Sequence, residues 1–298
     1  GSSGSSRSRH SERPRRIDGV SLTVMDRPIG MFDSGFGGLT VARAVIDLLP
    51  NEHLVYIGDT GRYPYGPRPQ SEVRAFAREL AWSLVRDHQV KAIVVACNTA
   101  SAAAIDVLKA ELPVPVIDVV EPGAKALVLA TESGRAGVIG TVGTIGSGAY
   151  VRAVEAVAAA VLKPVALTSA ACPGFVEFVE RGQTSGDDVT ILAERLLAPV
   201  RDAGVDTLLL GCTHYPYLAR VISDVMGQGV TLVSSADETA FEVQRVLATL
   251  GLLRGRDAVP AEHRFLSSGD PAWFAELGGR LLGPELRNAA AWRATDLA

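Results

Sequence analysis

The chain has 298 residues, 47% of them hydrophobic and 21% charged, which is the balance of a globular protein and excludes a function based on disorder. A single hydrophobic core seldom keeps growing at this length, so we expect two lobes of ordinary domain size. The net charge of -4 gives no basic surface for phosphate backbones and argues against direct nucleic-acid binding. The three cysteines include no C-x-x-C pair, so we expect a reducing, cytoplasmic location rather than a secreted disulfide framework.

Residues 1–24 differ in composition from the rest of the chain. Serine, glycine and arginine dominate them, and they have no apolar periodicity, so we interpret them as a tag and a disordered lead. The folded part is expected to begin near Met25. Nowhere does an apolar run reach the roughly 18 residues that a membrane span needs, so no membrane association is expected.

From residue 27 onward, short apolar runs alternate with amphipathic stretches. The first unit, residues 27–50, consists of a strand, a glycine-rich turn and a helix, and a second strand over 53–59 precedes a helix over 71–88. The alternation continues, with strands expected at 135–141, 163–169, 230–236 and 262–269 and helices at 121–134, 144–161, 187–203, 236–251 and 270–283. Such a repeat predicts an α/β protein with parallel sheets.

The turn after the first strand contains Gly35, Gly37 and Gly38, which indicate either an ordinary tight turn or a close approach of backbone to a ligand. Its G-x-G-x-x-T spacing departs from the dinucleotide fingerprint, and Asp33 would place a carboxylate beside a pyrophosphate. An amine-bearing ligand suits this turn better. A nucleotide-dependent oxidoreductase remains the alternative that this turn suggests.

The loop between 60 and 70 holds two tyrosines and three prolines. Prolines stiffen such a loop, so it could fix a tyrosine or a backbone amide over a site. The simpler interpretation is a rigid surface connection, which is the one we expect.

Two stretches of the chain are copies of each other at an offset of 115 residues: VKAIVVACNTAS (90–101) and VDTLLLGCTHYP (205–216). Each reads as a strand buried on both faces that ends at a cysteine, Cys97 in one and Cys212 in the other. The carboxyl ends of such strands are where open α/β sheets bind ligands. A single buried cysteine is usually a small hydrophobic residue, but two at equivalent places indicate paired chemistry.

The sequence around each cysteine predicts a helix N-terminus. Asn98, Thr99 and Ser101 are candidate cap residues after Cys97, and the helix start is expected to lower the pKa of that thiol. His214 could tune Cys212 or supply its proton, although a histidine at a helix start is more often a cap. Cys172 has no copy, and we interpret it as structural.

Two further polar positions are weaker candidates. Thr141 and Thr144 follow the strand at 135–141, where hydroxyls could bind a carboxylate. Glu180 ends a short amphipathic segment and, taken alone, is more often a solvated charge. No H-E-x-x-H, P-loop or zinc-spaced Cys/His cluster occurs, so the sequence indicates neither metal nor cofactor.

Taken together, six motifs resemble those of the bacterial glutamate racemases of the aspartate/glutamate racemase family: DSGFGG (33–38), GD (58–59), YPYG (63–66), CNTAS (97–101), GT-x-x-T (140–144) and GCTHYP (211–216). The resemblance implies two α/β lobes related by a pseudo-twofold axis, with the active site between them. The first lobe would comprise 25–120 plus 231–298 and the second 121–230.

The same resemblance implies cofactor-independent interconversion of L- and D-glutamate, which supplies D-glutamate for peptidoglycan and so for the cell wall and cell shape. Cys97 would take the proton from D-glutamate and Cys212 from L-glutamate, supported by Asp33, Glu180 and His214. The implied substrate contacts are Asp33, Ser34, Tyr65, Gly66, Asn98, Thr99, Thr213 and His214, to which Thr144 is added from its position. Around Glu180 the chain departs from the family pattern, with Glu177 and Phe178 where proline and leucine are common.

The expected partner is the small-molecule substrate glutamate, with a homodimer as the expected assembly. Some members of the family are thought to bind DNA gyrase, which makes a binding or regulatory protein of this fold one alternative. Aspartate racemase is the closest enzymatic alternative, because it uses the same two-base logic.

Overall fold

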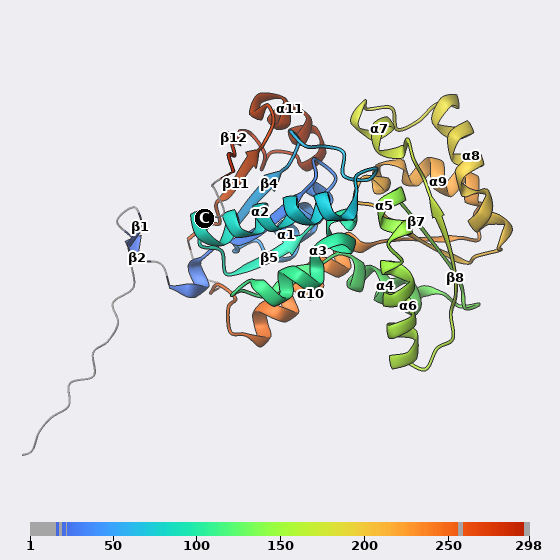
Figure 1. The fold of residues 1–298 in the computed structure, drawn as a ribbon, viewed down its shortest axis with the longest axis horizontal. Helices are drawn as coiled ribbons and strands as arrows, with labels where there is room; N and C mark the ends of the chain where they lie inside the picture. Colours follow the sequence, from blue (N-terminus) through green and yellow to red (C-terminus); the bar gives the residue numbers. More distant parts are fainter. Residues whose placement is uncertain (1–15, 18–19, 22, 256–258, 295–298) are drawn as a thin grey trace, which may run out of the picture.

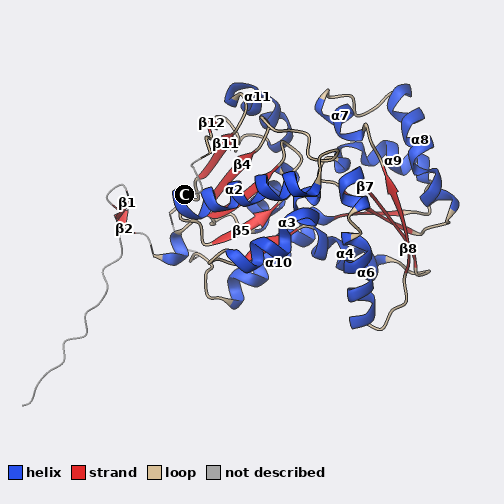
Figure 2. Cartoon of the chain, in the orientation of Figure 1, coloured by secondary structure: helices blue, strands red, loops and turns tan. Residues whose placement is uncertain are grey.

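The structure, a computed structural model, describes residues 16–17, 20–21, 23–255 and 259–294. It consists of two α/β lobes side by side, each built on a parallel sheet (Figures 1 and 2). This arrangement confirms the predicted fold class. None of the helices in the described ranges has the length and apolar character needed to cross a bilayer.

The strands are β1 (Arg16–Ile17), β2 (Val20–Ser21), β3 (Ile29–Asp33), β4 (Leu54–Gly58), β5 (Ala92–Val95), β6 (Val116–Asp118), β7 (Arg135–Gly140), β8 (Ala166–Ala171), β9 (Thr207–Gly211), β10 (Thr231–Ser234), β11 (His263–Ser267) and β12 (Ala290–Ala291). The α-helices are α1 (Leu39–Leu48), α2 (Gln70–His88), α3 (Asn98–Glu111), α4 (Val120–Ala130), α5 (Val142–Gly146), α6 (Ala149–Ala160), α7 (Phe175–Glu180), α8 (Asp187–Asp202), α9 (Ala219–Met226), α10 (Ser235–Thr249) and α11 (Pro271–Leu282). Two 3₁₀ helices, η1 (Val24–Asp26) and η2 (Tyr215–Leu218), complete the set.

The two large sheets share one strand order. In the first lobe the order is β12-β11-β4-β3-β5-β6, and in the second it is β10-β9-β7-β8. Numbered by appearance within each lobe, the four strands shared by both sheets follow the order 2-1-3-4, and every neighbouring pair among them is parallel. The internal repeat seen in the sequence is therefore a repeat of topology, in which β5 corresponds to β9.

Alternate residues of each strand face opposite helical layers, as expected for strands covered on both sides. In β5, Ala92 and Val94 join the core formed with α1, α10 and α11, while Ile93 and Val95 join the core formed with α2 and α3. The second sheet is covered in the same way, by α4 and α6 on one face and by α7, α8 and α9 on the other. This double burial explains why the strands read as continuous apolar runs.

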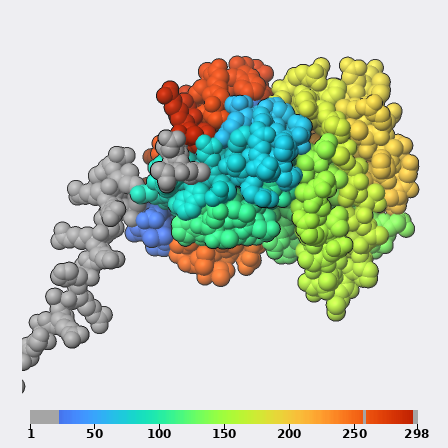
Figure 3. All heavy atoms as spheres, in the orientation of Figure 1, coloured from blue at the N-terminus to red at the C-terminus, as the bar shows by residue number. Residues whose placement is uncertain are grey.

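The chain returns to the first lobe after β10. The predicted division placed residues 231–298 in the first lobe, but β10 pairs with β9 and belongs to the second sheet. Helix α10 then packs on α1 of the first lobe and also on α4 of the second, and β11 extends the first sheet beside β4. In Figure 3 the orange and red C-terminal residues accordingly lie with the blue and teal first lobe.

Three local details differ from the sequence prediction. The helix expected over 144–161 is split into α5 and α6, because Gly148 adopts a left-handed conformation with φ of 69° between them. Strand β12 is too short to leave a sequence signal. Most of the lead predicted to be disordered lies outside the described residues, although within it β1 and β2 form a short antiparallel ladder.

A buried ion pair ties four separate segments of the first lobe together. Lys91, at the start of β5, pairs with Glu52 and donates to the backbone oxygens of Met25 at 2.6 Å and Leu252 at 2.9 Å. The other oxygen of Glu52 accepts from the backbone amide of Arg254 at 2.8 Å. Both charged side chains are almost fully buried, so the pair holds the returning segment against the start of the fold.

We expect Lys91→Met to lower the free energy of unfolding by about 3–5 kcal/mol, because it leaves the carboxylate of Glu52 buried without a counter-charge. The double variant Lys91→Met/Glu52→Gln removes both charges and keeps an acceptor for Arg254, so it should lose less. Lys109→Met is the matched control: its ion pair with Glu121 is exposed and 3.7 Å long, and its loss should cost below about 1 kcal/mol. Urea unfolding followed by circular dichroism measures all three, and equal losses for Lys91→Met and Lys109→Met would contradict this role for the buried pair.

Candidate active site

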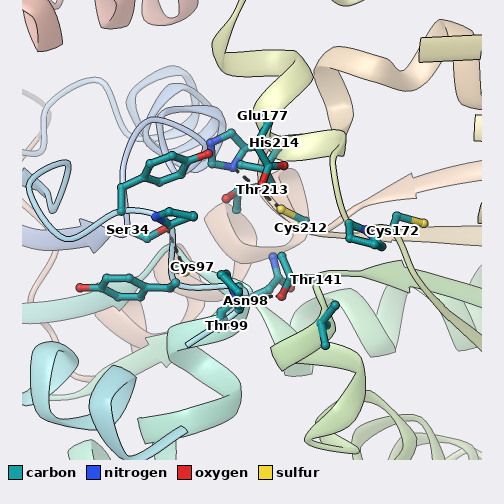
Figure 4. Close-up of a pocket in the computed structure, with 18 of the residues that line it drawn as sticks. Ser34, Cys97, Asn98, Thr99, Thr141, Cys172, Glu177, Cys212, Thr213 and His214 are labelled. Atoms are coloured by element: carbon teal, nitrogen blue, oxygen red, sulfur yellow. Dashed lines mark hydrogen bonds between the residues drawn. The ribbon is translucent and has the colours of Figure 1, made fainter. Parts of the chain in front are cut away.

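Cys97 and Cys212 lie at equivalent places in the two lobes. Cys97 follows β5 and Cys212 follows β9, the third strand of each repeat. In each sheet the third strand lies beside the first. The chain continues from the first strand toward one side of the sheet and from the third toward the other, so the two strands flank a topological switch point, where open sheets bind ligands. Both cysteines line one cavity of about 90 Å³ between the lobes (Figure 4).

Both lobes contribute to the wall of this cavity, through the ends of six strands (β3, β4 and β5 in the first lobe, β7, β8 and β9 in the second) and the loops that follow them. The lining residues are Ser34, Tyr63, Pro64, Tyr65, Gly66, Pro67, Cys97, Asn98, Thr99, Thr141, Val142, Cys172, Pro173, Gly174, Val176, Glu177, Cys212, Thr213 and His214. The wall includes no lysine or arginine. Its donors are neutral hydroxyls, an amide, backbone amides and the ring of His214.

Nine of the residues predicted for the site line the cavity: Ser34, Tyr65, Gly66, Cys97, Asn98, Thr99, Cys212, Thr213 and His214. The other three, Asp33, Thr144 and Glu180, do not line the cavity but contact residues that do. Asp33 is fully buried and accepts from the amide of Gly38 at 2.7 Å, while Glu180 contacts His214. The hydroxyl of Tyr65 donates its proton to Asp59, so this proton is not available to a ligand.

Cys97 is itself the N-cap of α3, a role that the sequence prediction had given to Asn98, Thr99 or Ser101. Its sulfur accepts from the amide of Ala100 at 3.5 Å and lies 3.7 Å from the hydroxyl of Ser34. The expected lowering of its pKa is not found. Burial, and next the carboxylate of Asp33, raise the pKa of the Cys97 thiol far above its usual range, and the helix start does not offset them.

Cys212 has a different environment, because a histidine and a carboxylate follow behind it. The Nδ1 atom of His214 lies 3.9 Å from the sulfur, and its Nε2 atom lies 3.1 Å from Oε1 of Glu180. Burial alone would lower the pKa of His214, but hydrogen bonds to Cys212 and Glu180 outweigh it and raise the pKa to about 10. His214 is therefore positively charged at neutral pH, next to a sulfur atom whose negative charge it would stabilise.

Glycine allows the turn after β3 to approach the Cys212 loop of the other lobe. A Cβ atom on Gly37 would lie 2.6 Å from Oγ1 of Thr213, and closer still to the ring of His214. Only glycine fits there without moving these side chains. The turn does make a close approach, but to the other lobe, and the approach to a ligand that was one of its two interpretations stays a prediction.

The lobes also meet along the opposite edge of the cavity. The hydroxyls of Thr99, Thr141 and Thr144 form a cluster with separations of 2.9–3.2 Å that joins the start of α3 to the start of α5. Nearby, the amide of Gly143 donates to the carbonyl of Gly66 at 3.0 Å. Thr144 thus contributes to the contact between the lobes. The cavity wall, where Thr144 had been predicted to bind the substrate, is formed by Thr141 instead.

Several lining residues were missed or undervalued in the sequence. The proline-rich loop does cover the site, since Tyr63, Pro64 and Pro67 line the cavity, so the simpler interpretation of that loop was wrong. Cys172 and Glu177 belong to the wall because β8 ends at the same edge as β7 and β9. The sequence did hold a signal for them, because they follow a predicted strand and all loops that follow the strands of a parallel sheet lie at the same edge.

No cluster of three or more His, Cys, Asp or Glu side chains with the spacing of a metal site occurs among the described residues. The cavity brings together three thiols, the carboxylate of Glu177, one charged histidine and several neutral donors, and two of the thiols, Cys97 and Cys212, come from different lobes. This set can remove a proton on one side of a bound molecule and deliver one on the other.

Comparison with known proteins agrees with this geometry. Residues 38–243 match the family profile described as Asp/Glu/Hydantoin racemase. The chain is 56% identical to a glutamate racemase of Parafrankia sp. over 259 residues, which cover 87% of this chain and 92% of that protein.

Solved structures give the same result. A glutamate racemase of Bacillus anthracis matches with a TM-score of 0.82 and 41% identity, covering 91% of this chain and 97% of that one. The glutamate racemase of Francisella tularensis, solved in complex with D-glutamate, matches with a TM-score of 0.82 and 33% identity over 90% of this chain and 98% of that one. The chain belongs to the Asp/Glu/Hydantoin racemase family and, within it, to the glutamate racemases.

Proposed function

We propose that this protein interconverts L- and D-glutamate without a cofactor, using Cys97 and Cys212 as a pair of acid/base catalysts. The observation that carries the proposal is the position of the two thiols. They follow equivalent strands of a repeated fold and line one cavity from different lobes. Inverting a carbon centre in a fixed substrate requires a proton acceptor on one side and a proton donor on the other, and this pair supplies both.

The reaction conserves protons within one turnover. A thiolate takes the α-proton from the substrate, the electron pair stays on the α-carbon and its carboxylate, and the opposite thiol gives its proton to the other face. The product leaves with inverted configuration, and the two cysteines have exchanged protonation states. In keeping with the family resemblance, Cys212 is assigned to L-glutamate and Cys97 to D-glutamate.

The surroundings of the two thiols favour one of the two starting states. Burial and Asp33 raise the pKa of Cys97 and keep it protonated, whereas charged His214 would stabilise a negative sulfur at Cys212. A protonated Cys97 and an anionic Cys212 form the state that accepts L-glutamate.

The preference for glutamate rests on the relatives. The family profile also spans aspartate and hydantoin racemases, so the fold alone leaves the substrate open. A 56% identical protein carries the name glutamate racemase, and a 33% identical one was solved with D-glutamate. The neutral donors of the wall, among them Asn98, Thr99 and Thr213, suit the two carboxylates of that substrate.

Several further expectations remain predictions. They are the supply of D-glutamate for peptidoglycan, a cytoplasmic location, assembly as a homodimer, and the binding of DNA gyrase that is attributed to some family members. We also propose a division into two lobes in which the second comprises residues 119–234 rather than the predicted 121–230, since β10 pairs with β9.

The purified protein is expected to change the circular dichroism of L-glutamate and of D-glutamate toward zero, while L-aspartate stays unchanged. The three substrates are measured side by side at equal concentration. A faster rate on L-aspartate would instead assign the aspartate racemase alternative, and no change with any of them would support a binding or regulatory protein.

We expect Cys97→Ser and Cys212→Ser each to lower kcat/KM by ~10²- to 10⁴-fold, because a serine hydroxyl is a far weaker acid than a thiol of similar size. The loss must be equal for both enantiomers, since their equilibrium constant is one. Cys172→Ser is the matched control, and it should stay within a few-fold of wild type even though Cys172 lines the same cavity. An inactive Cys172→Ser protein with normal folding would refute the pairing of Cys97 with Cys212.

Glu180→Gln is expected to move the alkaline limb of the kcat/KM profile to lower pH. His214 keeps its proton up to a pKa of about 10 because it bonds to Cys212 and Glu180, so removing the carboxylate lowers that pKa. At a fixed pH above both pKa values, the fraction of His214 that is charged falls by about tenfold for each unit by which the variant lowers that pKa. In Glu177→Gln, which alters a carboxylate one helical turn away that does not bond to His214, the limb should stay near its wild-type position. Identical profiles for wild type and Glu180→Gln would show that His214 does not need its charge.

A further inference from the structure

The side-chain amide of Asn98 is held at only one end. Its Oδ1 atom accepts a hydrogen bond from the hydroxyl of Tyr150, while its Nδ2 atom is buried and has no hydrogen-bond partner in the described part of the chain. Asn98 is 2% exposed and lines the cavity beside Cys97. A buried donor without a partner carries a desolvation cost, so a ligand acceptor is expected at this position.

We propose that Tyr150 is a positioning residue, which holds the Asn98 amide so that its Nδ2 atom donates to a carboxylate of the bound substrate. The inference rests on the proposed function, because it takes a dicarboxylic amino acid as the ligand. Tyr150 does not line the cavity and acts only through Asn98.

A tyrosine hydroxyl can impose this orientation because it keeps its proton. Tyr150 is 2% exposed, and burial, followed by the nearby charge of Asp118, raises its pKa well above the usual value. A protonated phenol beside an amide is best placed to donate, and the amide then offers its oxygen. The reversed amide would turn its oxygen toward an anionic substrate, which is repulsive.

The two residues come from different lobes. Asn98 is the first residue of α3 in the first lobe, and Tyr150 is the second residue of α6 in the second lobe. Gly148, in its left-handed conformation, ends α5 and allows α6 to begin at once, with Tyr150 packed into the core formed by α4, α6 and β9. The donor for the carboxylate is therefore complete only when the two lobes are in contact.

Tyr150→Phe tests the proposal, since it removes the hydroxyl and keeps the ring that fills the core. We expect KM for both enantiomers, and the dissociation constant of D-glutamate by calorimetry, to rise by ~10-fold, while kcat stays within ~3-fold. Thr239→Val is the control for a lost buried hydroxyl, because Thr239 bonds only to the backbone of its own helix α10. It should leave KM unchanged.

A double-mutant cycle separates positioning from a general structural role. Asn98→Ala should lower kcat/KM, and adding Tyr150→Phe to it should change kcat/KM by less than ~2-fold, since the hydroxyl then has nothing to orient. The proposal would be overturned if the fold-losses in kcat/KM of the two single variants multiplied in the double variant. A Tyr150→Phe protein with wild-type KM would overturn it as well.

A second variant covers the case in which Tyr150→Phe fails to fold. Asn98→Asp still accepts from Tyr150 but turns an oxygen toward the substrate, so it should raise KM more than Asn98→Ala does. Equal or tighter binding by Asn98→Asp would overturn the proposal. A wild-type protein that is inactive on glutamate would refute the proposed function and this inference together, whereas an active wild type with multiplying losses refutes only the role of Tyr150.

Discussion

The structure depends on one geometric constraint: the carboxyl ends of two parallel sheets must face each other across a single cavity. Each lobe presents the ends of its first and third strands there, so Asp33 and Cys97 come from one sheet, and Thr141 and Cys212 from the other. Neither lobe contains a complete site. The repeat brings one of the two paired cysteines, Cys97 and Cys212, to the cavity from each lobe, which is what the proposed reaction requires.

The lobes can come this close because small groups lie between them. Glycine occupies the contacts at Gly37 and Gly66, and threonine hydroxyls bridge the start of α3 to the start of α5. Equivalent positions do not have equivalent electrostatics, however. Cys97 lies near a buried carboxylate, whereas Cys212 lies near a charged histidine, so the two thiols have unlike charged neighbours. In the proposed reaction, this difference suits one thiol to start as an acid and the other as a base.

The fold class and most strands could be predicted from the sequence, because buried parallel strands leave apolar runs and their ends lie on one edge of a sheet. Most of the twelve candidate site residues came instead from the resemblance to the family's motifs, and nine of the twelve line the cavity. What escaped prediction depends on contacts distant in the sequence. The raised pKa of Cys97 depends on burial and on Asp33, which lies 64 residues earlier in the chain. The role of Glu177 and Cys172 in the wall depends on how β8 is aligned with β7, and the place of β10 depends on which neighbour it pairs with. A local pattern carries none of this information.

The return of the chain to the first lobe affects the order in which the protein can fold during its synthesis. The second lobe is continuous and complete once β10 has emerged from the ribosome, whereas the first still lacks β11, which pairs along the whole length of β4. Until then the edge of β4 is unpaired, and Lys91 and Glu52 lack the backbone partners at 252 and 254. The usual order, in which the N-terminal domain folds first, is therefore reversed here: the lobe that begins the chain is the last to be completed.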